Sequence, residues 1–101
     1  MKPTKYDHRH KLRITGDELR ELKRHTYAMV EAFGLDRKIE AYAGVRPITL
    51  YRWDLECLDA VMESALDDPG EYPDQSSPQY RALSRLLDRL RREYKSVYGD
   101  E

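Results

Sequence analysis

The sequence predicts a small all-α protein, in which four helices form a bundle behind a flexible N-terminal arm. Apolar residues recur at helical spacing through most of the chain, and Gly, Pro and Ser stand where helices would begin and end. No sustained alternation of apolar and polar residues and no Asn-Gly turn indicates strands. The 101 residues suffice for one domain. We expect a basic arm over 1–13 and a single helical domain over 14–98. The predicted helices cover about 16–33, 36–43, 47–66 and 77–98.

The first predicted helix begins at a T-x-x-E pattern. Thr15 and Glu18 can form a capping box, in which the Thr hydroxyl accepts the Glu18 N–H and the Glu carboxylate accepts the Thr15 N–H. Gly34 fits the left-handed position that often ends a helix. The apolar stripe between these ends contains Leu19, Leu22, Met29, Val30 and Phe33.

The second and third predicted helices meet at a Gly-containing corner. Asp36 can cap the second helix, and Gly44 supplies its stop. Pro47 suits the first turn of the third helix, where its missing N–H costs nothing. At about 100° per residue, the third helix is apolar around most of its circumference. Its opposite side carries Thr49, Arg52, Glu56, Asp59, Glu63 and Asp67.

Asp54 is a buried polar candidate, because it lies in the middle of the apolar arc of the third helix. An ionised carboxylate is costly to bury unless donors surround it. We interpret it as an acceptor for a Tyr, a His, an Arg or the exposed N–H groups at a helix start. The other interpretation makes it an acid or an anchor for a ligand.

The fourth predicted helix follows a loop over 67–78 that is dense in Pro, Gly, Asp and Ser. Ser76 or Ser77 can cap it, and Pro78 lies in its first turn. A heptad seam, typical of bundles and coiled coils, consists of Tyr80, Leu83, Leu87, Leu90, Tyr94 and Val97. This seam either closes the bundle of one chain or joins two copies.

The net charge of −1 gives no overall attraction to nucleic acid or anionic lipid. Local charge is uneven, since residues 54–74 hold eight acidic and no basic side chains. No apolar run approaches the length of a membrane span, and the N-terminus lacks the apolar centre of a secretory signal. The single Cys57 suits a reducing compartment. We therefore predict a cytoplasmic protein that does not enter a membrane.

Motifs that carry enzymatic chemistry are missing from the sequence. There is no Gly-rich phosphate loop, no H-E-x-x-H and no defensible Ser–His–Asp or Cys–His spacing. His8 and His10 lie near Asp7, but zinc sites need about four ligands at organised spacing, so we interpret them as part of a solvated arm. We expect no catalytic residue, no cofactor and no metal.

The stretch "AYAGVRPITLYRW", residues 41–53, resembles a helix-turn-helix motif when it is read with the preceding residues from 37 on. A Gly stands at the turn, and apolar residues occupy the expected offsets. The resemblance implies that Arg46, Thr49 and Arg52 contact bases and phosphates in a major groove. The chain departs from the motif at Glu40, where a small residue is usual, and in the acidic face that follows Arg52, which repels phosphates.

Two functions follow from these patterns. The favoured one is a non-enzymatic accessory or regulatory protein that binds another protein, or a second copy of itself in a homodimer. The residues expected at that interface are Glu56, Asp59, Glu63, Tyr80, Leu87 and Tyr94. The alternative is a helix-turn-helix DNA-binding regulator that uses Arg46, Thr49 and Arg52.

Overall fold

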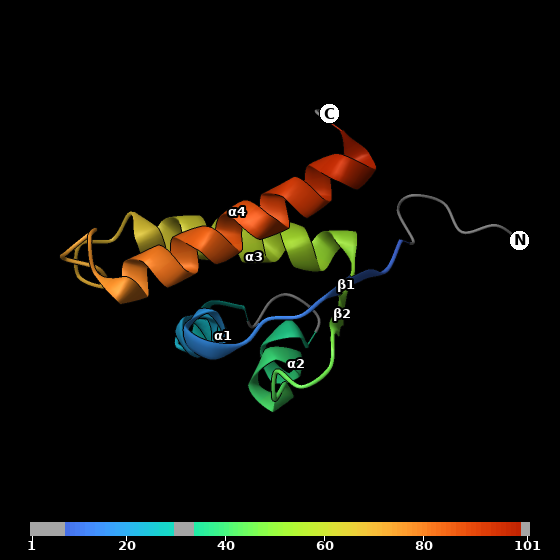
Figure 1. Ribbon diagram of the computed structural model, residues 1–101, viewed down its shortest axis with the longest axis horizontal. Helices are drawn as coiled ribbons and strands as arrows, with labels where there is room; N and C mark the ends of the chain where they lie inside the picture. The colour runs from blue at the N-terminus through green and yellow to red at the C-terminus, as the bar shows by residue number, and fades with distance from the viewer. Residues whose placement is uncertain (1–7, 30–33, 100–101) are drawn as a thin grey trace, which may run out of the picture.

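The computed structural model describes residues 8–29 and 34–99, which are mostly helical and include one small sheet (Figure 1). The helices are α1 (Gly16–Lys23), the 3-10 helix η2 (Thr26–Met29), α2 (Leu35–Ala41), α3 (Arg52–Leu66) and α4 (Pro78–Tyr98). The strands are β1 (His10–Leu12) and β2 (Ile48–Leu50). The prediction of a mainly helical domain is confirmed, but the prediction of a purely all-α fold is wrong.

The two longest helices, α3 and α4, pack side by side, and α1 packs on α4 while η2 contacts both α2 and α3. Figure 1 shows α1 and α2 on one side of the α3–α4 pair, with the strands near the start of α3. The residues at the centre of this arrangement are fully buried and include Leu22, Met29, Ile39, Leu50, Leu58, Met62, Leu83 and Leu86. Their burial supplies the main stabilising term, at about 1.5–3 kcal/mol for each large apolar side chain.

The small sheet corrects the predicted flexible arm. β1 and β2 pair antiparallel, with His10 opposite Leu50 and Leu12 opposite Ile48. The His10 side chain and the following Ile14 are both 0 % exposed, so residues 10–14 belong to the folded domain. Alternation in β2 covers only three residues, which is too short to stand out as a strand pattern. The first seven residues of the predicted arm lie outside the described residues.

The predicted first helix is shorter than 16–33. α1 ends at Lys23, Arg24 and His25 form a turn, and η2 follows. The Thr15 side chain makes no capping hydrogen bond, so the predicted capping box is wrong. The Glu18 carboxylate instead accepts a hydrogen bond from the Arg89 guanidinium of α4. The predicted stripe residues Val30 and Phe33 lie outside the described residues.

The predicted helix over 47–66 begins five residues later, at Arg52. The reason lies in Asp54, whose Oδ2 accepts the Tyr51 N–H at 3.0 Å and so satisfies a donor at the helix start. Asp54 is 3 % exposed, and Lys38 Nζ lies 3.7 Å from the same oxygen. Its interpretation as a buried acceptor for N–H groups at a helix start is confirmed.

The remaining helix predictions hold within one or two residues. α2 covers Leu35–Ala41 in place of 36–43, and α4 covers Pro78–Tyr98 in place of 77–98. Ser77 caps α4, since its Oγ accepts the Tyr80 N–H at 3.2 Å. In the described part of the chain, no helix combines the length and the apolar character that crossing a membrane requires.

Candidate functional site

A groove with a volume of about 380 Å³ lies between α3 and α4. Leu55 from α3 and Leu90 from α4 line it, and each is 2 % exposed. Ala60 of α3, which has a small side chain, also lines the groove. The groove therefore has an apolar floor that is held rigidly by two packed helices.

The rim of the groove on the α3 side is acidic. Glu56, Asp59 and Glu63 follow one another at spacings of three and four residues, which places them on one face of the helix. Their side chains are 53 %, 36 % and 59 % exposed, respectively. All three predicted interface residues of α3 thus come together along one edge of the groove, where solvent and a partner can reach them.

Arg91 of α4 crosses the groove and bridges two of these carboxylates. Its Nε donates to Asp59 Oδ2 at 2.8 Å, and its Nη2 donates to Glu63 Oε2 at 3.2 Å. The hydrogen bond to Asp59 raises the pKa of Arg91 above its already high ordinary value, so the guanidinium stays charged. The residues that line the groove carry three carboxylates and one guanidinium, and the site keeps a negative excess.

Tyr94 closes one end of the groove and connects it to Arg52. The Tyr94 hydroxyl donates to Glu56 Oε2 at 3.0 Å and accepts from Arg52 Nε at 3.1 Å. The Arg52 guanidinium carbon also lies 5.6 Å from the centre of the Tyr94 ring and 4.8 Å from that of Tyr98. Arg52 is therefore held against α4 by cation–π and hydrogen-bond contacts.

An aromatic pair, half-buried Tyr51 and exposed Trp53, lies at the start of α3. The rings of Tyr51 and Trp53 are stacked, with centroids 4.8 Å apart and planes 11° from parallel. Trp53 is 47 % exposed and precedes Glu56 by one helical turn, on the same face. Aromatic residues of this kind are enriched at protein interfaces.

The predicted interface residues on α4 do not all belong to this site. Leu87 is 5 % exposed and lies in the core, so its prediction as an interface residue is wrong. The heptad seam packs inside the molecule, because Leu83 and Leu90 are buried with it. Tyr80 contacts Tyr72 edge-on at 5.9 Å and lies about 21 Å from Tyr94 along the helix axis.

The three predicted DNA-contact residues lie on different elements. Arg46 is exposed in the turn before β2, Thr49 is half-buried within β2, and Arg52 begins α3. Residues 42–51 separate α2 from α3, so β2 stands where the second helix of the motif was expected to begin. The three side chains therefore do not share one helical face.

A buried polar chain joins α1 to the loop before α4. The Tyr72 hydroxyl donates a hydrogen bond to Glu21 Oε1 at 2.9 Å. Because this bond uses its only proton, the hydroxyl accepts from His25 Nε2, which lies 2.9 Å away and must carry a proton. Arg24 donates to the same Glu21 oxygen at 2.6 Å. Burial lowers the pKa of His25 and raises the pKa of Tyr72 far above its usual range. This chain of hydrogen bonds thus contains a neutral imidazole and a protonated phenol, and it anchors the loop before α4 to α1.

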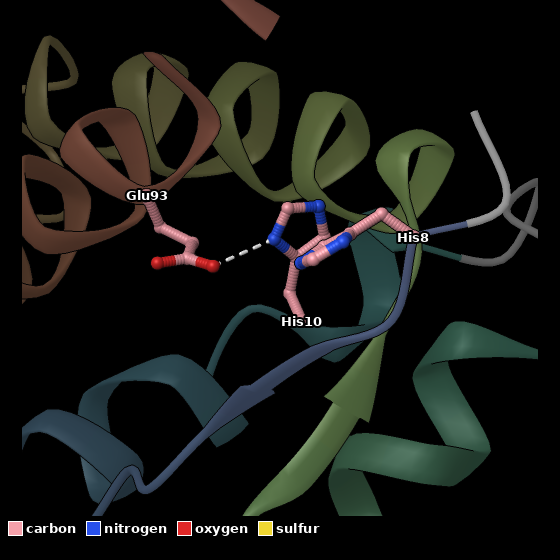
Figure 2. A group of neighbouring side chains, drawn as sticks. All are labelled: His8, His10 and Glu93. Carbon is pink, nitrogen blue, oxygen red and sulfur yellow. Dashed lines mark hydrogen bonds and ion pairs between the residues drawn. The ribbon is translucent and has the colours of Figure 1, made fainter. Parts of the chain in front are cut away.

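A third cluster brings two histidines together with a glutamate of α4 (Figure 2). His10 Nδ1 lies 2.8 Å from Glu93 Oε1, and its Nε2 lies 2.8 Å from the Tyr98 hydroxyl. The His8 ring contacts the His10 ring edge-on, with centroids 4.6 Å apart. The interpretation of His10 as part of a solvated arm is wrong, whereas His8 is exposed.

The sequence alone pointed to the acidic face of α3, but it gave no signal for the bridging role of Arg91 or for the groove between α3 and α4. Both depend on the rotation of α4 against α3, which is set by tertiary packing. Trp53, which the sequence did not mark as a functional residue, is 47 % exposed. Comparison with known proteins finds no match to a protein-family model, to a curated protein sequence or to a solved structure.

Proposed function

We propose that this chain is a non-enzymatic accessory or regulatory protein that binds a basic, partly apolar segment of another protein in the α3–α4 groove. The observation that carries the proposal is an apolar floor beneath a rim of three carboxylates. Apolar side chains of a partner would bury against Leu55 and Leu90, and Lys or Arg side chains would pair with the rim. This combination of an apolar centre and a charged edge is typical of protein interfaces.

The dimensions of the rim favour a short helical segment as the occupant. From Glu56 to Glu63 the helix rises about 10 Å, which equals two helical turns. A partner helix with basic residues at positions i, i+3 and i+7 would match the spacing of the three carboxylates. Trp53 would extend the contact past the end of the groove and act as an aromatic anchor.

A binding role agrees better with the side chains present than a catalytic one. The Cys57 thiol is half-buried, and burial raises its pKa, which disfavours the reactive thiolate at neutral pH. The Glu21–His25–Tyr72 chain holds its protons in fixed hydrogen bonds and connects two segments of the fold. A reduced thiol also suits the cytoplasm, which we propose as the compartment.

The test measures fluorescence polarisation of a labelled amphipathic Leu/Lys peptide titrated with the full chain. We expect saturable binding that weakens toward about 0.5 M salt, because exposed charges are screened. Glu56→Lys should weaken binding about five- to tenfold, since it reverses a rim charge. Asp67→Lys is the matched control, because Asp67 lies exposed directly after the end of α3, outside the lining of the groove, and carries the same charge.

Equal weakening by both variants would show that the peptide responds only to overall charge, and it would contradict the groove proposal. A labelled random DNA duplex forms the second arm of the test. Binding of the duplex in preference to the peptide, with loss in Arg46→Ala, would favour the DNA-binding alternative. Light scattering on the same samples tests self-association, and a mass of two chains in the absence of peptide would make a second copy the occupant.

A further inference from the structure

We infer that His8, His10 and Glu93 form a binding site for a divalent transition-metal ion, with Zn²⁺ as its representative. The site lies where the segment at the start of β1 approaches the last turns of α4, and it shares no residue with the lining of the α3–α4 groove. A bound ion would link these two segments through its ligands. The inference is independent of the proposed protein-binding function, because it rests on different residues and a different ligand.

The three side chains converge from segments that are distant in the sequence. His8 and His10 are two residues apart in extended chain, which places both imidazoles on the same side of the backbone. Glu93 reaches them from α4, 83 residues beyond His10. One ligand atom from each residue lies within 4.8 Å of the other two. Figure 2 shows both rings and the carboxylate directed toward one shared space.

The donor set selects the class of ion. Two imidazole nitrogens and one carboxylate oxygen are a combination that zinc accepts, with a further position left for water. Imidazole also suits copper and nickel, whereas Mg²⁺ and Ca²⁺ prefer shells made of oxygen. The site should therefore discriminate strongly between Zn²⁺ and Mg²⁺.

His10 is already oriented as a metal ligand should be. Its Nε2 faces the Tyr98 hydroxyl at 2.8 Å, and Tyr98 is itself 3 % exposed. In the Nδ1–H tautomer, His10 donates to Glu93 and accepts from the Tyr98 hydroxyl; in the Nε2–H tautomer it donates to Tyr98, and its Nδ1 lone pair becomes available to a metal ion. In the hydrogen-bonded form the Nδ1 proton lies between His10 and Glu93. Metal binding at Nδ1 selects the other tautomer: Nδ1 loses its proton to solvent, Nε2 takes one up, and the Tyr98 hydroxyl becomes its acceptor.

Closing the site requires a small movement that His8 can supply. Zinc–nitrogen bonds of about 2.0–2.1 Å place neighbouring ligand atoms about 3.3 Å apart. His10 Nδ1 and Glu93 Oε1, now 2.8 Å apart, must therefore separate slightly, while the wider spacings in the cluster, all within 4.8 Å, must close. The His8 side chain is exposed and can change rotamer at little cost, whereas His10 is fixed by packing and two hydrogen bonds. His8 is therefore the residue whose loss affects metal binding without affecting the folded core.

The test is calorimetric titration of the untagged, metal-free full chain with Zn²⁺, and then with Mg²⁺. We expect one equivalent of Zn²⁺ to bind and to raise the melting temperature, with no binding of Mg²⁺. His8→Ala and Glu93→Gln should each weaken Zn²⁺ binding about tenfold or more. Arg9→Ala is the control, because Arg9 is an exposed neighbour outside the cluster, and its Zn²⁺ affinity should equal that of the natural chain.

Co²⁺ provides a second readout, since its visible absorption reports coordination number directly. A tetrahedral or five-coordinate spectrum that is lost in His8→Ala would support the site. Absence of saturable Zn²⁺ binding would overturn the inference, and so would Zn²⁺ binding that His8→Ala and Glu93→Gln leave unchanged. A folded, peptide-binding protein that takes up no Zn²⁺ would overturn this inference alone.

Discussion

At the scale of single residues, Asp54 sets the residue at which α3 begins. Its carboxylate accepts the Tyr51 N–H, so α3 begins at Arg52 although a proline-initiated helix from 47 was expected. A buried carboxylate remains stable there because the N–H group and Lys38 compensate its lost hydration. One local hydrogen bond thus frees residues 48–50 to pair as a strand.

Asp54→Ala should lower the free energy of unfolding by about 1–2 kcal/mol, because it leaves a helix-start N–H without its acceptor. For a domain of this size the melting temperature would fall by about 4–8 °C for each kcal/mol. Asp54→Asn keeps an acceptor oxygen and should lose less. Thermal unfolding followed by circular dichroism measures both variants, and an unchanged melting temperature in Asp54→Ala would refute the capping role.

His25 should make stability depend on pH. Burial, as the largest cause, lowers its pKa below the ordinary value of 6.5, while the unfolded chain keeps that value. As the pH falls below about 6.5, His25 therefore binds a proton in the unfolded state before it does so in the folded state. The contribution of His25 to the free energy of unfolding is fully present at pH values above the unfolded pKa. Below that pKa it declines, by at most about 1.4 kcal/mol per pH unit.

Urea unfolding of the natural chain and of His25→Gln, at pH 7.5 and pH 5.5, checks this expectation. The natural chain should lose more stability between the two pH values than the variant, because a glutamine side chain does not titrate. An equal loss in both proteins would assign the pH dependence to other groups.

At the scale of elements, local signals predicted some boundaries and missed others for identifiable reasons. α4 was predicted closely because Ser77, Pro78 and the heptad seam all act within one segment. β1 was missed because His10 reads as polar, and its burial depends on Glu93 and Tyr98, more than 80 residues away. The break after Lys23 was missed because the apolar spacing continues through η2. The acidic rim was predictable from helical spacing, whereas the depth of the groove depends on how α4 lies against α3.

Gly44 lies in the turn between α2 and β2, close to the backbone of the segment before α1. Its φ of +79° favours glycine, and an added Cβ would lie 3.2 Å from the Ile14 carbonyl oxygen. Gly44→Ala should destabilise the fold by about 1–3 kcal/mol through backbone strain and this contact. Gly16→Ala is the matched control, because Gly16 has φ of +58° but nothing within 4 Å of the added Cβ. Urea unfolding of both variants measures the difference, and equal losses would show that the close approach adds nothing beyond the strain.

At the scale of the whole molecule, an almost neutral chain separates its charges in space. Eight acidic and no basic side chains occupy residues 54–74, which contain nearly all of α3. Ion pairs within the molecule neutralise part of this charge. Arg52 pairs with Glu56 at one end of the acidic rim, and Arg91 pairs with Asp59 and Glu63 at the other. The remaining excess borders an apolar groove beside an exposed tryptophan. Net charge alone therefore describes the molecule less well than the face that α3 presents.

Backbone amide mapping by NMR tests whether this face of α3 binds basic segments of a partner, as we propose. Unlabelled Leu/Lys peptide is added to the ¹⁵N-labelled full chain, and the amide signals that shift are assigned. We predict shifts concentrated at Trp53, Glu56, Ala60, Glu63 and Arg91. Shifts concentrated at Arg46 and Thr49, or spread evenly over the surface, would contradict the account.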